Sequence, residues 1–75
     1  MNIRKPALHD IVAVLQDVEE QRVKAGWVGT VVEILDEGVY LIEIADAQGR
    51  TLLLPTLRAK VLLVLDPVQA GLAPV

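Results

Sequence analysis

The chain contains no cysteine and no phenylalanine, and it has one histidine, one tryptophan and one tyrosine among its 75 residues. The absence of cysteine excludes disulfides and thiolate zinc sites. A single histidine, His9, leaves little material for a nucleophile with its base, or for a histidine-rich metal site. We therefore expect a protein without catalytic residues, metal ligands or cofactor.

Basic residues are also in the minority. Seven Lys and Arg stand against ten Asp and Glu, which gives a net charge of −3. This balance disfavours a partner that is recognised mainly through its phosphates. No apolar run approaches the roughly 18 residues of a membrane-spanning helix, and the first residues lack the layout of a signal peptide. We therefore expect a cytoplasmic protein that binds neither nucleic acid nor a membrane.

Aliphatic side chains are what the chain has in excess, since 53% of its residues are hydrophobic. That fraction is high for a single small domain, in which the core is usually marginal. Either the core is large for the length of the chain, or part of the apolar surface meets another chain.

The strands are expected to be arranged around residues 26–35. Two glycines, Gly26 and Gly29, precede a β-branched apolar run there, which predicts a tight turn followed by a strongly bent strand over about 28–35. Strict alternation places apolar side chains on both faces of this strand. We therefore expect the strand to be curled within a barrel, and we expect a carboxylate at Val32 or Ile34 to destabilise the fold severely.

Further strands are predicted where β-branched and aliphatic runs are separated by turn residues. The sequences at 36–38 and 46–49 each combine Asp with Gly and predict two hairpin connections. Pro55 cannot donate to a strand ladder, so residues 55–59 are expected to form a single 3₁₀ turn. The additional strands are expected over residues 11–16, 39–45, 50–54 and 60–65.

Two segments near the N-terminus carry alternatives. A helix over residues 7–18 competes with the strand at 11–16, because Leu8, Ile11, Leu15 and Val18 also fall at helical spacing. The mixed-charge segment 17–25 predicts a long exposed loop, and long loops in small barrels commonly carry the binding surface. Its candidate partner contacts are Glu19, Glu20 and Arg22.

The predicted fold is all-β: an SH3-like small five-stranded barrel over residues 1–66, with one 3₁₀ turn before the last strand and an apolar C-terminal tail over 67–75. The last strand is apolar on both faces, so Leu63 and Leu65 are candidate partner contacts, together with Leu72 in the tail. Trp27 stands between two glycines at the junction of loop and strand. It either packs on the end of the barrel or serves as a partly exposed anchor for a partner.

One stretch of the sequence resembles a family of small bacterial proteins known only as a domain of unknown function. The core of the resemblance is Gly26-Trp27-Val28-Gly29-Thr30-Val31-Val32-Glu33, which is similar to the family pattern G-x-V-G-T-V-V-E. The similarity extends over about residues 7–65. It implies an SH3-like fold and a protein partner, and it brings no catalytic residues.

A looser similarity exists to the KOW motif of ribosomal and transcription-elongation proteins and to the SH3-like barrels of nitrile hydratase β subunits. The shared part is Gly26-x-x-Gly29-Thr30-Val31. KOW domains bind RNA or protein through basic loops, whereas the corresponding loop here carries Asp17, Glu19 and Glu20.

From these observations we expect a non-catalytic protein-interaction module, either an antitoxin-like protein or an accessory subunit. It would meet a protein partner, or a second copy of itself in a homo-oligomer, through the last strand and the tail. The alternative is a KOW-like RNA-binding module, and an enzyme comes third.

Overall fold

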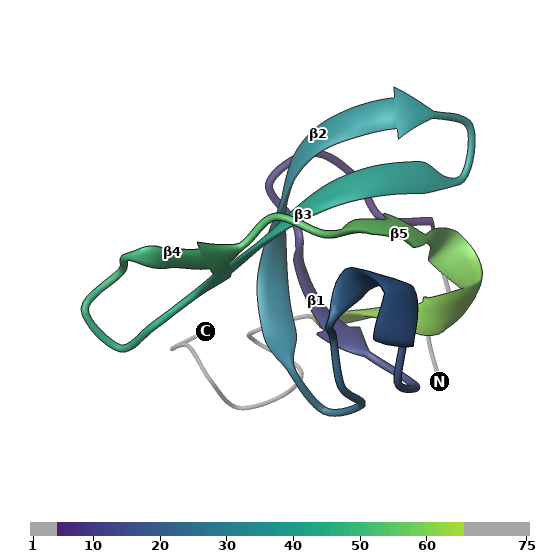
Figure 1. Cartoon of the computed structure of the whole chain (residues 1–75). Helices are drawn as coiled ribbons and strands as arrows, with labels where there is room; N and C mark the ends of the chain where they lie inside the picture. The colour runs from purple at the N-terminus through teal and green to yellow at the C-terminus, as the bar shows by residue number, and fades with distance from the viewer. Residues whose placement is uncertain (1–4, 66–75) are drawn as a thin grey trace.

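The computed structural model describes residues 5–65, and every strand in this range belongs to one antiparallel sheet (Figure 1). Its strand order is β4-β3-β2-β1-β6. β5 lies off this order and pairs with the first residues of β3, whereas β4 pairs with the last residues of β3. The elements in chain order are β1 (Ile11–Val14), η1 (Glu19–Gln21), β2 (Val28–Asp36), β3 (Val39–Ala45), β4 (Thr51–Leu53), β5 (Thr56–Arg58), η2 (Ala59–Val61) and β6 (Leu62–Leu65), where η marks a 3₁₀ turn.

The alternative of a helix over residues 7–18 is wrong, and the strand that begins at Ile11 is confirmed. Side chains of β1 alternate in burial, with Val12 and Val14 in the core and Ile11 exposed, which is the period of a strand. A helix would have wrapped this apolar run around most of its surface. β1 gains a neighbour on each side instead, since it pairs with both β2 and β6.

The β2–β3 hairpin is the longest pairing in the sheet and turns at Glu37 and Gly38, as expected. Gly38 has φ of +74°, a left-handed conformation that costs glycine little. Two shifts of register occur in β2, between Val31 and Glu33 and again between Ile34 and Asp36. Such bulges increase local twist and bend a strand, and Figure 1 shows β2 strongly curved.

Pro55 divides what would otherwise be one long strand into β4 and β5. The proline has no N–H to donate, but its carbonyl accepts the N–H of Ile42 at 2.9 Å, so pairing with β3 resumes at once. The prediction of a 3₁₀ turn over residues 55–59 is therefore wrong. Those residues are mainly β5, and the 3₁₀ turn η2 comes after it at Ala59–Val61.

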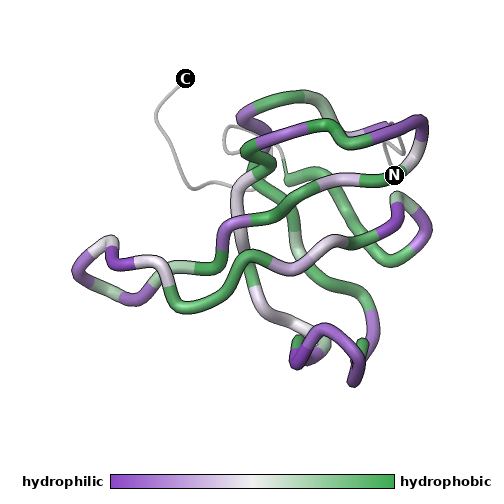
Figure 2. The backbone as a smooth tube through the Cα atoms, turned by 45° about the horizontal axis from the view of Figure 1, so that its top comes forward, coloured by the Kyte–Doolittle hydropathy of each residue, from purple (hydrophilic) through white to green (hydrophobic). Residues whose placement is uncertain are grey.

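The sheet has six strands and is not closed into a barrel, which corrects the prediction of a closed five-stranded one. In the described part of the chain β6 pairs with β1, and it pairs with neither β4 nor β5. The sheet curls around the core without joining its two edges. Figure 2 shows hydrophobic stretches running along the curled strands and hydrophilic ones at the turns.

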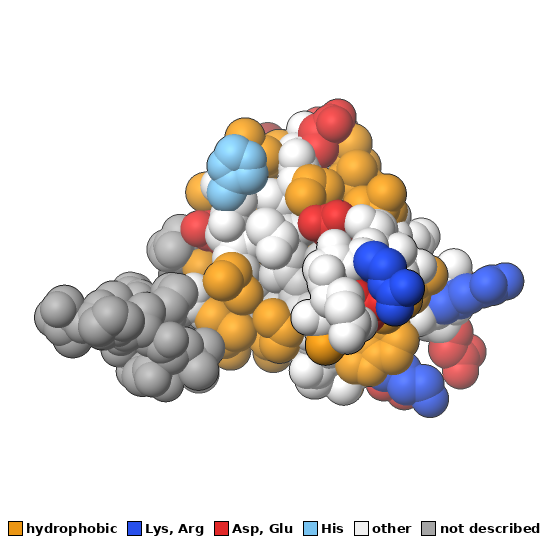
Figure 3. All heavy atoms as spheres, turned by 90° about the vertical axis from the view of Figure 1, so that its left-hand side faces the viewer, with side chains coloured by type: hydrophobic (Ala, Val, Ile, Leu, Met, Phe, Trp, Pro, Cys, Tyr) orange, Lys and Arg blue, Asp and Glu red, His pale blue; other side chains and the backbone are white. Residues whose placement is uncertain are grey.

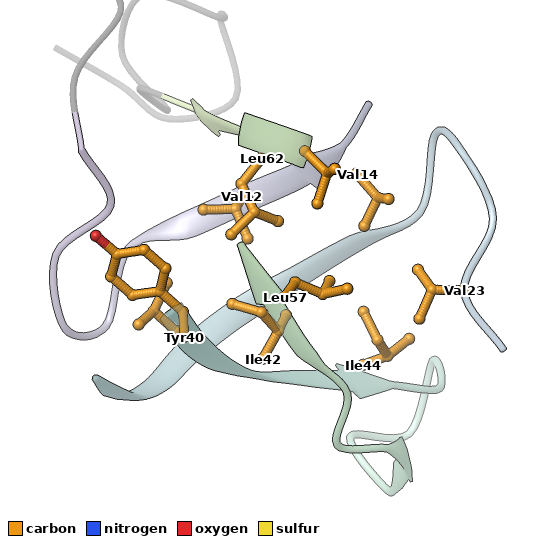
Figure 4. Close-up of a cluster of buried hydrophobic side chains, with 10 residues drawn as sticks. Val12, Val14, Val23, Tyr40, Ile42, Ile44, Leu57 and Leu62 are labelled. Carbon is orange, nitrogen blue, oxygen red and sulfur yellow. The ribbon is translucent and has the colours of Figure 1, made fainter. Parts of the chain in front are cut away.

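The core is a cluster of ten buried side chains drawn from five strands, η2 and the loop before β2 (Figure 4). Ile42 and Leu57 are the largest of its fully buried members. The cluster consists of Val12, Val14, Val23, Val31, Tyr40, Ile42, Ile44, Leu57, Val61 and Leu62.

Two expectations about burial are corrected by this core. Val23 was placed in a wholly exposed loop, yet it is 2% exposed and forms an isolated β-bridge with Val18. Ile34 was expected to be critical for the core, yet it is 49% exposed. Every residue of β2 after its first bulge, from Glu33 to Asp36, is exposed, so this end of the strand adds no side chain to the core. Val31 is the β2 side chain that fills the interior.

Gly29 occupies a place in β2 where no side chain fits. A Cβ atom there would lie 2.6 Å from Cγ2 of Ile42, 2.7 Å from the carbonyl oxygen of Glu43 and 2.8 Å from Cδ1 of Ile44. Opposite it on β1 is Val12, which is fully buried. Gly29 therefore lets β2 approach β3 closely over the interior of the sheet.

The predicted tail over residues 67–75, including Leu72, lies outside the described residues.

Candidate functional site

A groove of about 440 Å³ lies between the η1 segment and the β5–η2 segment. The two walls are tied together because Oε1 of Gln21 accepts the backbone N–H of Thr56 at 3.0 Å. One wall carries Asp17 and Glu20, and the other carries Arg58 and Lys60. The lining residues are Gln16, Asp17, Val18, Glu20, Gln21, Val39, Thr56, Leu57, Arg58, Lys60 and Val61.

The three loop residues predicted as partner contacts are divided by this geometry. Glu20 lines the groove, whereas Glu19 and Arg22 line a smaller hollow of about 300 Å³ with Lys24. Arg22 ends η1 in the left-handed conformation, with φ of +59°. Its N–H donates to the carbonyl of Glu19 at 3.0 Å, which fixes the turn. These side chains are exposed, and no residue of the last strand lines either hollow.

A second surface lies on the side of β1, β2 and β6 that faces away from the core. The register places Ala13 of β1 between Val28 of β2 and Leu63 of β6, and Ile11 next to Leu65. Val28 is 49% exposed, and Leu15, which continues the alternation of β1, is 52% exposed. We call this surface the outer apolar face; its residues are Ile11, Ala13, Leu15, Val28, Leu63 and Leu65.

Two of the predicted contacts, Leu63 and Leu65, belong to the outer apolar face, where both are half-buried. The prediction missed its residues on β1 and β2. The signal for the residues of β1 was the continuous apolar run 11–15, because such a run in a strand puts hydrophobic side chains on both faces. Exposed hydrophobic side chains also appear in Figure 3, on the side of the molecule from which the β3–β4 hairpin projects.

Trp27 lies just before β2 and is 37% exposed. Its carbonyl accepts the N–H of Val14 at 2.8 Å, so its backbone is held against the end of β1. It lines neither hollow, and it is next in sequence to Val28 of the outer apolar face.

Carboxylates border the outer apolar face. Glu43 of β3 pairs in register with Thr30 of β2, and one of its carboxylate oxygens accepts the hydroxyl of Thr51. Glu33, further along β2, is exposed. The four strands β1, β2, β3 and β6 contain no Lys or Arg. This side of the sheet therefore combines aliphatic side chains with negative charge.

Asp46 accepts three hydrogen bonds, and its role is in a turn. One of its oxygens accepts the backbone N–H groups of Gln48 and Arg50, both at 2.9 Å, and the other accepts Nε of Arg50 at 2.9 Å. The hydrogen bond from the backbone of Arg50 is the main reason that the pKa of Asp46 lies below its usual value. These contacts hold the β3–β4 turn.

Asp10 likewise acts on local backbone, since Oδ2 accepts the N–H of Ala7 at 2.8 Å. Across residues 5–65 there is no group of three or more His, Asp or Glu side chains placed to hold a metal ion. Within the same range, no helix has the length and hydropathy needed to cross a membrane.

Comparison with known proteins gave one match. The model of a protein family described as "Domain of unknown function (DUF4926)" matches residues 8–64, which is more than half of the chain. No curated protein and no solved structure matches the chain. The finding agrees with the expected resemblance to an uncharacterised family.

Proposed function

The chain belongs to the family of the Domain of unknown function (DUF4926), and we propose that it is a non-catalytic protein-interaction module, either an antitoxin-like protein or an accessory subunit. It meets its partner through the outer apolar face. Residues of the last strand were expected to take part, and Leu63 and Leu65 are now joined by side chains of β1 and β2.

The observation that carries the proposal is the exposure of aliphatic side chains that are contiguous in register. Leu15 and Val28 are each about half exposed, and Ile11 is 39% exposed. Covering the exposed half of one such side chain is worth roughly 1 kcal/mol. A contiguous apolar surface bordered by polar groups is typical of a site that contacts another protein.

The same proposal includes an SH3-like origin for the fold. The order β6-β1-β2-β3, with β4 and β5 on the far side of β3, supports it, as does the 3₁₀ turn before the last strand. The domain would then be an open form of that barrel.

Affinity purification from the native host, followed by mass spectrometry, tests the proposed function. Leu15→Lys and Val28→Lys each place a charge on the outer apolar face, and both should abolish recovery of the partner. Leu52→Lys is the matched control, because Leu52 is 61% exposed on β4 and lies off that face. Circular dichroism should show that all three variants fold. A wild-type chain that recovers no protein and is strictly monomeric by light scattering would refute the proposal.

The alternative of a KOW-like RNA-binding module stays a prediction, and no feature of the described residues favours it. The strands that form most of the sheet lack basic side chains, whereas nucleic-acid surfaces depend on them. Salt-sensitive retardation of structured RNA in a gel would support this alternative.

A further inference from the structure

We propose that the partner presents a basic amphipathic helix to the outer apolar face, with its leucine-like side chains on that face and its Lys or Arg side chains against the neighbouring carboxylates. The inference rests on the proposed function and names the chemistry of the partner. Two observations carry it, the sign of the charges around the face and the size of the face.

The charged side chains on the strands that form and flank the face are all negative. In β1, β2, β3 and β6 the only charged residues are Glu33, Asp36 and Glu43. Glu43 lies beside Thr30, the neighbour of Ile11 in the sheet, so a carboxylate stands next to the apolar side chains. Its carboxylate accepts a hydrogen bond from the Thr51 hydroxyl and, among the described residues, has no ion pair with a basic side chain.

Basic side chains of the described chain lie elsewhere. Lys5 and Arg50 are already paired with carboxylates, at 3.6 Å from Glu37 and 2.9 Å from Asp46. The others are on the η1 loop or on β5 and η2; they are Arg22, Lys24, Arg58 and Lys60. A binding surface with carboxylates and no cations is complementary to a partner that brings the positive charge.

The same distribution disfavours a second copy of the chain as the occupant. A two-fold dimer would bring the outer apolar face against itself, because an isologous interface uses one patch twice. Glu43 and its symmetry mate would then border the same interface with no Lys or Arg from either sheet face to pair with them. Like charges brought together in this way oppose association.

The size of the face points to a helix. Along β1 the face runs from Ile11 to Leu15, about 13 Å at the rise of a strand, and it spans three strands, about 10 Å between the axes of the outer two. A helix with its side chains is about 10–12 Å across, so one helix covers this width. A standard interface between two domains involves about 20–30 residues on each partner, far more than the six residues of this face.

The first experiment uses two labelled synthetic peptides of about 18 residues, long enough to form helix on a surface. Both have leucine at helical spacing on one side; the other side is Lys in one peptide and Glu in its matched control. Fluorescence anisotropy with the full chain should show binding of the Lys peptide at about 50 mM salt, weakened at about 200 mM. The Glu peptide should bind at least about tenfold more weakly. Equal binding of the two peptides would overturn the inference.

Variants then locate the site. Val28→Lys should weaken binding of the Lys peptide at least about tenfold, as expected for a central contact. Glu43→Gln should weaken it about two- to fivefold, as expected for an exposed ion pair. Two control variants, Leu52→Lys and Glu20→Gln in the groove, should leave the affinity for the Lys peptide unchanged. Amide shifts in NMR spectra should change at Ala13 and Val28; changes confined to the groove would overturn the inference.

Two further outcomes name a different occupant, and each would overturn the inference. Sedimentation that shows a dimer of the free chain, broken by Val28→Lys, would assign the face to a second copy. Contacts in NMR spectra between the methyl groups of Leu72 and Val28 would assign it to the chain's own C-terminal residues. If Val28→Lys abolishes capture of the native partner while the Lys peptide fails to bind, the proposed function stands and this inference fails.

Discussion

Replacing Gly29 with alanine should destabilise the domain more than any other single added methyl group in β2. The new Cβ would lie 2.6 Å from Cγ2 of Ile42, which is fully buried. It would also lie 2.7 Å from the carbonyl oxygen of Glu43, which can move only if the β2–β3 ladder moves with it. Overpacking of this kind costs about 1–3 kcal/mol. We expect the upper part of that range, because backbone is one of the obstacles.

Alanine also lowers the conformational entropy of the unfolded chain relative to glycine, which offsets about 0.5–1 kcal/mol. The net loss is then about 2 kcal/mol, or a fall in melting temperature of about 8–16 °C for a domain of this size. Thermal unfolding followed by circular dichroism measures it. Gly38→Asn is the control, because Gly38 has open space around its Cα and asparagine tolerates its positive φ, so this variant should melt close to the wild type.

A double variant removes one of the three close contacts expected at Gly29 and leaves the other two. Ile44→Val removes the Cδ1 atom that would lie 2.8 Å from the new Cβ, but it leaves the carbonyl of Glu43 in place. Gly29→Ala combined with Ile44→Val should therefore recover little stability. The reasoning is refuted if Gly29→Ala melts within about 2 °C of the wild type, or if the double variant fully restores the single variant's loss.

The described contacts give three other predictions. In urea denaturation Val31→Asp should lower the free energy of unfolding by about 3–5 kcal/mol or prevent folding, because Val31 is fully buried. Ile34→Asp should change it by no more than about 1 kcal/mol, because Ile34 is 49% exposed. Equal losses would contradict the register of β2. Gln21→Ala should lower the free energy of unfolding by about 1 kcal/mol and speed hydrogen exchange of the Thr56 amide, whose N–H donates to the Gln21 side chain. Unchanged exchange at Thr56 would contradict this hydrogen bond. Folding lowers the pKa of Asp46, so the hydrogen bonds of its carboxylate stabilise the β3–β4 turn at pH values above the unfolded pKa, and this stabilisation is lost as the pH falls through the lower pKa of the folded state. NMR titration of the Asp46 carboxyl should show a midpoint below 3.8 that Arg50→Ala moves upward. A midpoint at or above 3.8 would refute this.

The strands could be located from the sequence because turn chemistry and β-branched runs act locally. Gly38 and Gly49 both adopt the positive φ that their places in the turns suggested, and all strands except β5 start within two residues of where they were expected. The break at Pro55 was also visible. The return of the chain to β3 after that break was not, because a missing N–H marks where a ladder is interrupted and leaves open whether a neighbouring strand takes the chain back.

Burial depended on pairing between distant segments and could not be obtained in the same way. Val23 looks like part of a charged loop, and only its bridge to Val18 turns it into the core. Ile34 looks like core, yet β2 is exposed from Glu33 to Asp36, beyond its first bulge. Two of the six residues of the outer apolar face, Leu63 and Leu65, were predicted, but its completion by Val28 required the register of three strands.

The pairing of β1 with β6 has a consequence for how the protein is made. β1 is synthesised before every other strand of the described sheet, and one of its two neighbours does not exist until Leu65 has been translated. The β2–β3 hairpin joins residues close in sequence and can form much earlier. Until synthesis passes residue 65, one side of β1 offers unpaired backbone groups to any other nascent chain.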